Sequence, residues 1–222
     1  MTAKDEKIEA EEWAEKGENF LRSENYANAL DCFNNAIALY DKNALYYYKR
    51  GNCFTELDNF TAAMEDYNKS IKLNPTFSFV YYKKGNLYFK NNEFGNALKL
   101  FNESIKLNNN FSFAYLAKAK VYAEENKFVD ALQMINEALH HNNGISEAYS
   151  IRGDLFYKAG NYEEALMDYS RAIKIDSNNT ESLRKRANCF IATGETMNAI
   201  KDYSSIINKK PEDTESLKAR SL

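Results

Sequence analysis

The residues of this chain that could do chemistry gather first in the stretch YYYKRGN, at positions 46–52. Three tyrosines beside two cations could stack on nucleic-acid bases or hold a peptide, because rings take planar or apolar groups while cations attract acids. Neighbouring residues of a helix point in different directions, so some of these side chains must belong to the scaffold instead. The chemistry of the stretch therefore depends on the elements that carry it.

The sequence offers little for catalysis or metal binding. Its only histidines, His140 and His141, are adjacent, and adjacent helical residues point about 100° apart, so one metal ion rarely takes both. They precede NNG at a predicted helix end, where imidazoles commonly hydrogen-bond terminal carbonyls. None of the motifs GxxxxGK(S/T), GxSxG, HExxH or GxGxxG occurs. We predict a protein that is not an enzyme and that uses no metal or cofactor.

The composition limits which cellular compartment and which partners can be expected. The three cysteines are far apart and lack CxxC spacing, which suits buried thiols in a reducing compartment. The formal charge of −3 gives no global basic field that would favour nucleic acid or an anionic membrane. No apolar run approaches the roughly 20 residues that span a bilayer, and the acidic N-terminus lacks the pattern of a signal peptide. We expect a cytoplasmic protein with no membrane contact.

A repeat of 34 residues organises the chain. The segment YYYKRGNCF at 46–54 returns as VYYKKGNLYF at 80–89. In six contiguous units the eighth position is always Gly or Ala, the twentieth is always Ala, and positions 4, 11 and 24 are large. Positions 4, 8 and 11 form one helical stripe and positions 20, 24 and 27 a second, so each unit is predicted to be two helices. The predicted units are 10–43, 44–77, 78–111, 112–145, 146–179 and 180–213, with an N-terminal extension at 1–9 and a partial capping helix at 214–222.

This pattern resembles the tetratricopeptide repeat (TPR) family, whose repeats are also about 34 residues long. The resemblance implies an all-α fold, a right-handed α-solenoid (superhelix) of six helix–turn–helix repeats, because one hairpin cannot bury both faces and its neighbours must stack on it. It also implies a non-catalytic scaffold or adaptor whose concave groove, lined by the first helices, binds a peptide segment of a partner protein. The sequence departs from the family at position 7, where a cation replaces the usual leucine. We expect the stems of these cations to cover apolar surface while their charged heads reach water.

Positions 2, 5, 9 and 12 of each first helix lie about 100° from the packing stripe and are expected to face the groove. In the opening stretch, Tyr47 is then scaffold, Tyr46 packs against adjacent helices, and Tyr48 and Asn52 face the groove with Lys49 near it. Rings can take apolar side chains, asparagine amides can pair with a peptide backbone, and lysines attract acidic groups. Phe89 and Leu116 belong to the same stripe. The predicted site consists of Tyr48, Lys49, Asn52, Phe79, Tyr82, Lys83, Asn86, Phe113 and Lys120.

Three kinds of partner are compatible with the sequence: a protein or peptide, a second copy of the chain, and single-stranded nucleic acid. The family's specialised groove for the C-terminal carboxylate of a chaperone tail requires five residues, of which only Lys83 matches in one register and only Asn52 in the next, so we do not expect that standard clamp. A protein or peptide with acidic groups is the first expectation. Self-association through the terminal helices is an alternative, because either the acidic N-terminal helix or the C-terminal end, which the short helix at 214–222 covers incompletely, could dock on a second copy. Binding of single-stranded nucleic acid is a weaker alternative, since the near-neutral charge argues against it.

Overall fold

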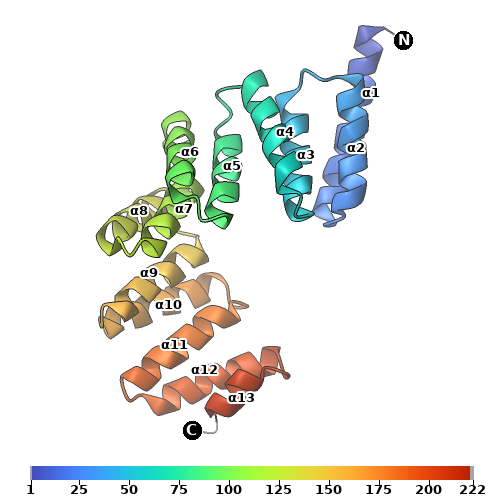
Figure 1. Ribbon diagram of the computed structural model, residues 1–222. Coiled ribbons are helices and arrows are strands. Elements are labelled where there is room, and N and C mark those ends of the chain that lie inside the picture. Colours follow the sequence, from blue (N-terminus) through green and yellow to red (C-terminus); the bar gives the residue numbers. More distant parts are fainter. Residues whose placement is uncertain (1, 221–222) are drawn as a thin grey trace. The chain divides into compact units, whose positions relative to one another are not determined.

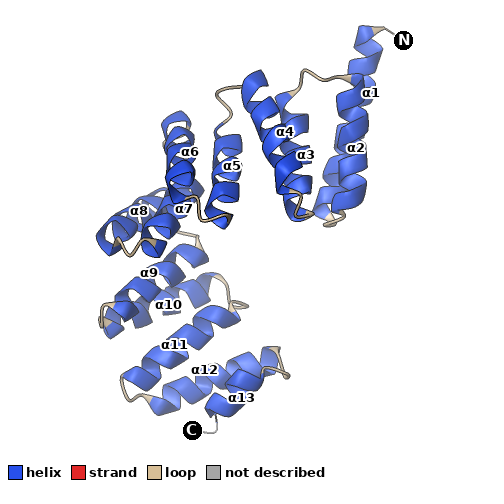
Figure 2. Cartoon of the chain, viewed as in Figure 1, coloured by secondary structure: helices blue, strands red, loops and turns tan. Residues whose placement is uncertain are grey.

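The computed structural model describes residues 2–220, in which thirteen helices and no strand occur (Figures 1 and 2). Met1, at the start of the predicted extension, and residues 221–222, at the end of the predicted capping helix, lie outside the described residues. The helices are Ala3–Arg22 (α1), Tyr26–Leu39 (α2), Ala44–Glu56 (α3), Phe60–Leu73 (α4), Ser78–Lys90 (α5), Phe94–Leu107 (α6), Ser112–Glu124 (α7), Phe128–His141 (α8), Ser146–Lys158 (α9), Tyr162–Ile175 (α10), Thr180–Ala192 (α11), Thr196–Lys209 (α12) and Thr214–Arg220 (α13).

The predicted all-α fold of helix–turn–helix pairs is confirmed. The chain divides into two compact units, Met1–Ala114 and Tyr115–Leu222, which are described separately. In the first unit α1 packs on α2, α3 on α4 and α5 on α6, and each pair contacts the next. The second unit repeats the arrangement with α9 on α10 and α11 on α12, and α13 packs on α12. Among the described residues, no helix is both long and apolar enough to cross a membrane.

A small residue against a large ring joins the helices of a pair. A Cβ atom added to Gly85 on α5 would lie 2.6 Å from Cε1 of Phe101 on α6, and one added to Gly51 on α3 would lie 2.7 Å from Cε1 of Tyr67 on α4. Both rings are fully buried. Position 8 must therefore be small because the ring at position 24 of the same repeat occupies the space that a side chain would need.

The arginines at position 7 link neighbouring repeats, and their charged heads bind protein groups while about one-fifth of each side chain stays exposed. Arg50 donates from Nε and Nη2 to the two carboxylate oxygens of Asp66, at 2.8 and 2.7 Å, and from Nη1 to Asn34 of the preceding repeat at 2.9 Å. Asp66 is buried, so this charge-assisted fork satisfies a carboxylate that would otherwise be costly to bury. The same fork recurs in the pairs Arg152–Asp168 and Arg186–Asp202.

Each turn between paired helices contains one residue with a left-handed backbone. In the first unit these residues carry side chains, as at Glu24 with φ 56° and Asp58 with φ 55°. The last two turns of the second unit use Gly160 and Gly194 instead. Because only glycine adopts this conformation without steric cost, the turns at Gly160 and Gly194 carry less backbone strain than the turns with a side chain, which include Asn126 in the second unit.

Candidate functional site

The opening stretch YYYKRGN divides between core and surface. Tyr46 and Tyr47 are buried, with 3% and 7% of their surface exposed, as the sequence predicts. Tyr46 packs in a core cluster with Ala10 of α1, and Tyr47 lies 5.6 Å from the guanidinium of Arg50. Tyr48 remains partly exposed. One helical turn thus supplies two core rings and a single ring for the surface.

The exposed ring of Tyr48 begins a row of aromatic side chains in the first unit. Its centroid lies 5.0 Å from that of Phe77, which lies 6.2 Å from Phe79. Phe79 in turn lies 4.5 Å from Phe111, and Phe111 lies 6.1 Å from Phe113. These separations are typical of interacting aromatic rings. We call the row Tyr48, Phe77, Phe79, Phe111 and Phe113 the aromatic strip.

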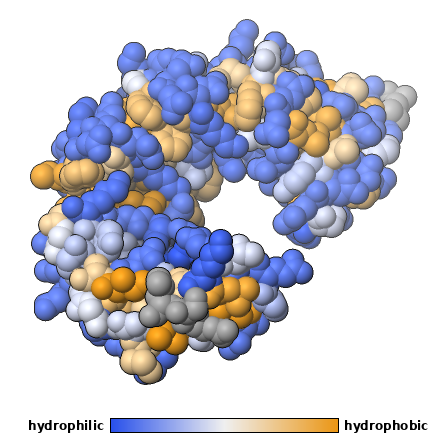
Figure 3. Space-filling model, turned by 60° about the horizontal axis from the view of Figure 1, so that its bottom comes forward, coloured by the Kyte–Doolittle hydropathy of each residue, from blue (hydrophilic) through white to orange (hydrophobic). Residues whose placement is uncertain are grey.

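The aromatic strip is only partly covered by protein. Phe79 and Phe113 are 43% and 44% exposed, while Phe111 beneath them is buried. Tyr82 supports Phe111 edge-on at 5.1 Å. Leu45 occupies position 2 of the preceding repeat, the position of Phe79 and Phe113, and is 42% exposed. Position 2 therefore presents an apolar side chain in three consecutive repeats. Figure 3 shows one face of the molecule, on which hydrophobic patches interrupt a mostly hydrophilic surface.

The polar residues of the predicted site differ in how far their hydrogen-bonding groups are used. Asn52 accepts a hydrogen bond of 2.8 Å from the hydroxyl of Tyr67, so its carbonyl oxygen is engaged. Asn86 occupies the same position one repeat later, where the facing ring is Phe101 and offers no hydroxyl. Within the described residues, the side chains of Asn86 and Lys83 make no hydrogen bond or ion pair to the protein. Both side chains are therefore unengaged polar groups of the site.

The other two lysines of the predicted site are paired. Lys49 Nζ lies 2.7 Å from a carboxylate oxygen of Glu18 on α1, and less than a quarter of the lysine side chain is exposed. Lys120 lies in the second unit, where its Nζ is 2.6 Å from Glu147. Both are partly shielded pairs, in which each acid already neutralises the lysine. A ligand would have to displace the acid to reach either cation.

The structure changes the predicted set of surface residues in several places. Leu116, which the sequence pattern places on the groove stripe, is 2% exposed and belongs to the core of the second unit. Phe89 is partly buried and rests on Phe94 of its own helix pair at 5.8 Å. Sequence analysis missed Phe77 and Phe111, because both lie just before a helix begins, outside the helical stripes. Their recurrence as an aromatic at position 34 is the signal that could have found them.

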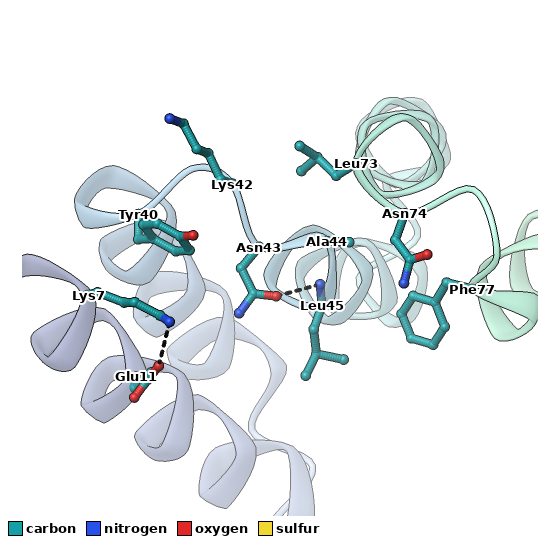
Figure 4. Close-up of a pocket in the computed structure, with 10 residues that line it drawn as sticks. All are labelled: Lys7, Glu11, Tyr40, Lys42, Asn43, Ala44, Leu45, Leu73, Asn74 and Phe77. Carbon is teal, nitrogen blue, oxygen red and sulfur yellow. Dashed lines mark hydrogen bonds and ion pairs between the residues drawn. The ribbon is translucent and has the colours of Figure 1, made fainter. Parts of the chain in front are cut away.

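A pocket of about 630 Å³ adjoins the strip at the edge formed by the loops after α2 and α4 (Figure 4). Its lining includes Leu45, Phe77 and Asn43, and the side-chain oxygen of Asn43 accepts from the backbone N–H of Leu45 at 2.9 Å. Lys7 and Glu11 of α1 face each other on one side at 4.0 Å, and Phe77 lies on the opposite side (Figure 4). The pocket thus continues the apolar surface of Leu45 and Phe77 toward charged groups.

The described residues contain no group of three or more His, Cys, Asp or Glu that could hold a metal ion. His141 stacks on Tyr115, with 5.4 Å between ring centroids. The three cysteines are free and buried, and burial raises the pKa of the Cys53 thiol to about 12, so Cys53 stays protonated at neutral pH. The groups that remain accessible at the site are the rings of the aromatic strip, the amides of Asn52 and Asn86, and the ammonium group of Lys83. Groups of these kinds can contact a ligand through apolar surface, hydrogen bonds and charge.

Comparisons with known proteins agree with the fold. Residues 44–77 and 78–111 each match a family model described as tetratricopeptide repeat, and residues 153–194 match one described as TPR repeat. The chain belongs to the tetratricopeptide repeat family. No curated protein matches its sequence. The family and fold support a protein–protein interaction scaffold in general, and repeat proteins of this kind are generally not catalysts.

Several solved structures share the architecture at low sequence identity. PilF of Pseudomonas aeruginosa superposes with a TM-score of 0.83 at 16% identity, over 98% of this chain and 99% of PilF. PilW, a type IV pilus biogenesis factor, gives 0.83 at 16% identity, over 96% of this chain and 98% of its own. YrrB, described as a TPR protein with an unusual peptide-binding site, gives 0.61 at 19% identity, over 86% of this chain and 98% of its own. At these identities the likeness extends to the fold.

Proposed function

We propose that the chain is an adaptor that binds a peptide segment of a partner protein on the first-helix face of the unit Met1–Ala114. The observation that carries the proposal is the aromatic strip, in which Phe79 and Phe113 are more than two-fifths exposed although they lie on a continuous row of rings. Apolar patches that are rimmed by polar groups are typical of interaction sites on soluble proteins. Aromatic residues are enriched at the core of such interfaces, where a few anchoring residues supply most of the binding energy.

The polar groups beside the strip suit a peptide more than a flat protein surface. Asn86 can both donate and accept, which is what the backbone of an extended peptide requires. Asn52 keeps its amide protons for the same use, since only its oxygen is engaged by Tyr67. The proposed contact residues are therefore Tyr48, Asn52, Phe79, Tyr82, Lys83, Asn86 and Phe113. Lys49 and Lys120 are left out, because their charges are already paired.

We also propose a cytoplasmic location. Its support is that Cys32, Cys53 and Cys189 are all free and buried, as expected of a protein from a reducing compartment.

A library of random 12-residue peptides displayed on phage tests the binding site and requires no identified partner. Selection on the wild-type chain should enrich a consensus with aromatic or branched apolar residues. The variant Phe79→Ser, Phe113→Ser should lose this enrichment while its circular dichroism spectrum stays unchanged, because both side chains are exposed. A consensus that survives in the variant would contradict the proposed site, and the absence of any consensus on the wild type would contradict peptide binding itself.

A further inference from the structure

The repeats pair a lysine with an acid in two places, and a third place of the same kind lacks the acid. Lys49 stands at position 6 of its repeat and pairs at 2.7 Å with Glu18, at position 9 of the repeat before. In the second unit, Lys185 at position 6 pairs at 2.7 Å with Asp154 at position 9 of the preceding repeat. Position 6 and the preceding position 9 are thus neighbours in both units.

Lys83 occupies position 6 of the third repeat, and the preceding position 9 is Asn52. The surroundings of Asn52 match those of Asp154: Tyr67 donates to the side chain of Asn52 at 2.8 Å, and Tyr169 donates to that of Asp154 at 2.9 Å. An amide therefore stands where the equivalent residue is a carboxylate. It cannot neutralise a lysine, so the charge of Lys83 is left uncompensated within the described residues.

The surroundings of Lys83 are the most apolar part of the same face. Position 2 of its own repeat is the exposed Phe79, and position 5 is Tyr82, which contacts Phe111. A cation next to exposed rings favours a ligand that brings one negative charge within an apolar segment. A second negative charge would find no cation at position 2, because Phe79 and Phe113 stand there.

We propose that Lys83 binds an aspartate or glutamate side chain of the partner, located inside an otherwise apolar segment, and that this acid takes the place of the missing carboxylate at position 9. The inference rests on the proposed function and specifies its ligand. The recognised group is a side chain, so the C-terminal carboxylate of the partner plays no part. Asn52 then acts as a specificity determinant, because its neutrality leaves Lys83 available.

The substitution Asn52→Asp tests this directly, since it gives the second and third repeats the arrangement that Asp154 and Lys185 already show. Phage selection on the wild type should enrich one Asp or Glu among apolar residues. Selection on Asn52→Asp should keep the apolar residues and lose the acid. A synthetic wild-type consensus peptide should bind Asn52→Asp about tenfold more weakly by calorimetry. Lys83→Glu should instead select Lys or Arg at the position of the acid.

The controls separate this inference from the proposed function. Asn68→Asp adds the same charge on α4, beside Lys84, and should leave the affinity within about twofold of the wild type. Amidating the C-terminus of the peptide should also change nothing. An apolar consensus without an acid, an acid preference that survives Asn52→Asp, or a tenfold loss on amidation would overturn the inference and leave peptide binding intact. Failure to select any consensus would overturn both.

Discussion

The first-helix faces of the two units differ at position 2 of the repeat. In the first unit, position 2 is Glu11 in the first repeat, but the later residues at this position, Leu45, Phe79 and Phe113, are apolar and more than two-fifths exposed. In the second unit the same position is Glu147 or Glu181, and both acids lie near cations, Glu147 near Lys120 at 2.6 Å and Glu181 near Arg184 at 3.8 Å. The second and third repeats thus present apolar side chains at position 2 and one unpaired lysine, Lys83, whereas in the second unit the acids at position 2 lie near cations.

This difference shows that interior positions of the repeat determine the fold, whereas positions on the first-helix face determine what the protein can bind. Positions 8, 20 and 24 meet in the interior of every repeat, where Gly85 touches Phe101 in the first unit and Gly153 touches Tyr169 in the second. These contacts fix the helix pair and leave no freedom. Positions 2 and 9 are at least partly exposed in every repeat, as is position 6 except at the buried Ala117, and substitutions at exposed positions cost little stability. The two units therefore share a scaffold and differ in what their surfaces can bind.

The largest effect on stability and binding is expected when the same overpacking substitution is made in each unit. Gly85→Leu and Gly153→Leu both force a side chain into a buried ring, at 2.6 and 2.7 Å from the nearest ring carbon, and should each cost about 1–3 kcal/mol of unfolding free energy. Gly85→Leu should also abolish binding of the selected peptide, whereas Gly153→Leu should preserve it. Thermal melts and calorimetry check both results.

Gly95→Leu is the matched control for these variants. No heavy atom lies within 4 Å of a Cβ added at Gly95, and leucine is the better helix former, so stability should hold or rise by up to about 1 kcal/mol. If Gly85→Leu and Gly153→Leu weaken peptide binding equally, the assignment of binding to the first unit is wrong.

The next largest effect is expected on peptide affinity, when position 2 is changed in one unit and then in the other. Phe79→Ser removes an exposed ring from the aromatic strip and should weaken the selected peptide by about 2 kcal/mol, or roughly 30-fold, as expected of an aromatic anchor. Glu147→Ser changes the equivalent position of the second unit and should leave the dissociation constant within about twofold. Calorimetric titration of both variants decides the point, and similar losses at the two positions would remove the contrast.

A smaller effect is expected in the turns, where the units also differ. Glu24 holds a left-handed φ of 56°, so Glu24→Gly should stabilise the protein by about 0.5–1 kcal/mol. Gly160, with φ 79°, should show the opposite sign when replaced, and Gly160→Ala should cost about 1 kcal/mol. Urea unfolding measures both, and peptide affinity should not change. A loss of stability in Glu24→Gly would show that its side chain contributes more than its backbone costs.

The smallest effect on stability is expected from removing the acid that pairs with Lys185 in the second unit. Asp154→Asn keeps an acceptor for the hydroxyl of Tyr169 and removes the charge that pairs with Lys185, so it copies the pair of Asn52 and Lys83. Because both side chains of the ion pair are about one-third exposed, the cost should be only about 0.2–1 kcal/mol. Urea unfolding at low salt should reveal this loss, and high salt should reduce it. A much larger loss would mean that the pair holds the two repeats together.

The sequence predicted the scaffold well because each part of that prediction is a property of one helix. The 34-residue period and the small eighth residue place Tyr46 and Tyr47 in the core, whatever their neighbours are. The ion pair between Glu18 and Lys49 could not be read in this way, since it joins positions 9 and 6 of different repeats. The burial of Leu116 was missed for a similar reason, because a helical stripe does not show which neighbouring elements cover it.

The candidate site was predicted only in outline. Phe79, Lys83 and Asn86 follow from helical geometry, but the strip is completed by Phe77 and Phe111, which precede their helices. Whether a lysine is free depends on a partner 31 residues away in sequence, as between Asp154 and Lys185. Such relations become visible only when neighbouring repeats are seen side by side.

Amide hydrogen–deuterium exchange of the wild-type chain, with and without the selected peptide, tests the central claim most directly. The account predicts that the peptide slows exchange in α3 and α5 of the first unit and leaves α9 and α11 of the second unchanged. Protection confined to α9 and α11, or to the second helices α4 and α6, would contradict it.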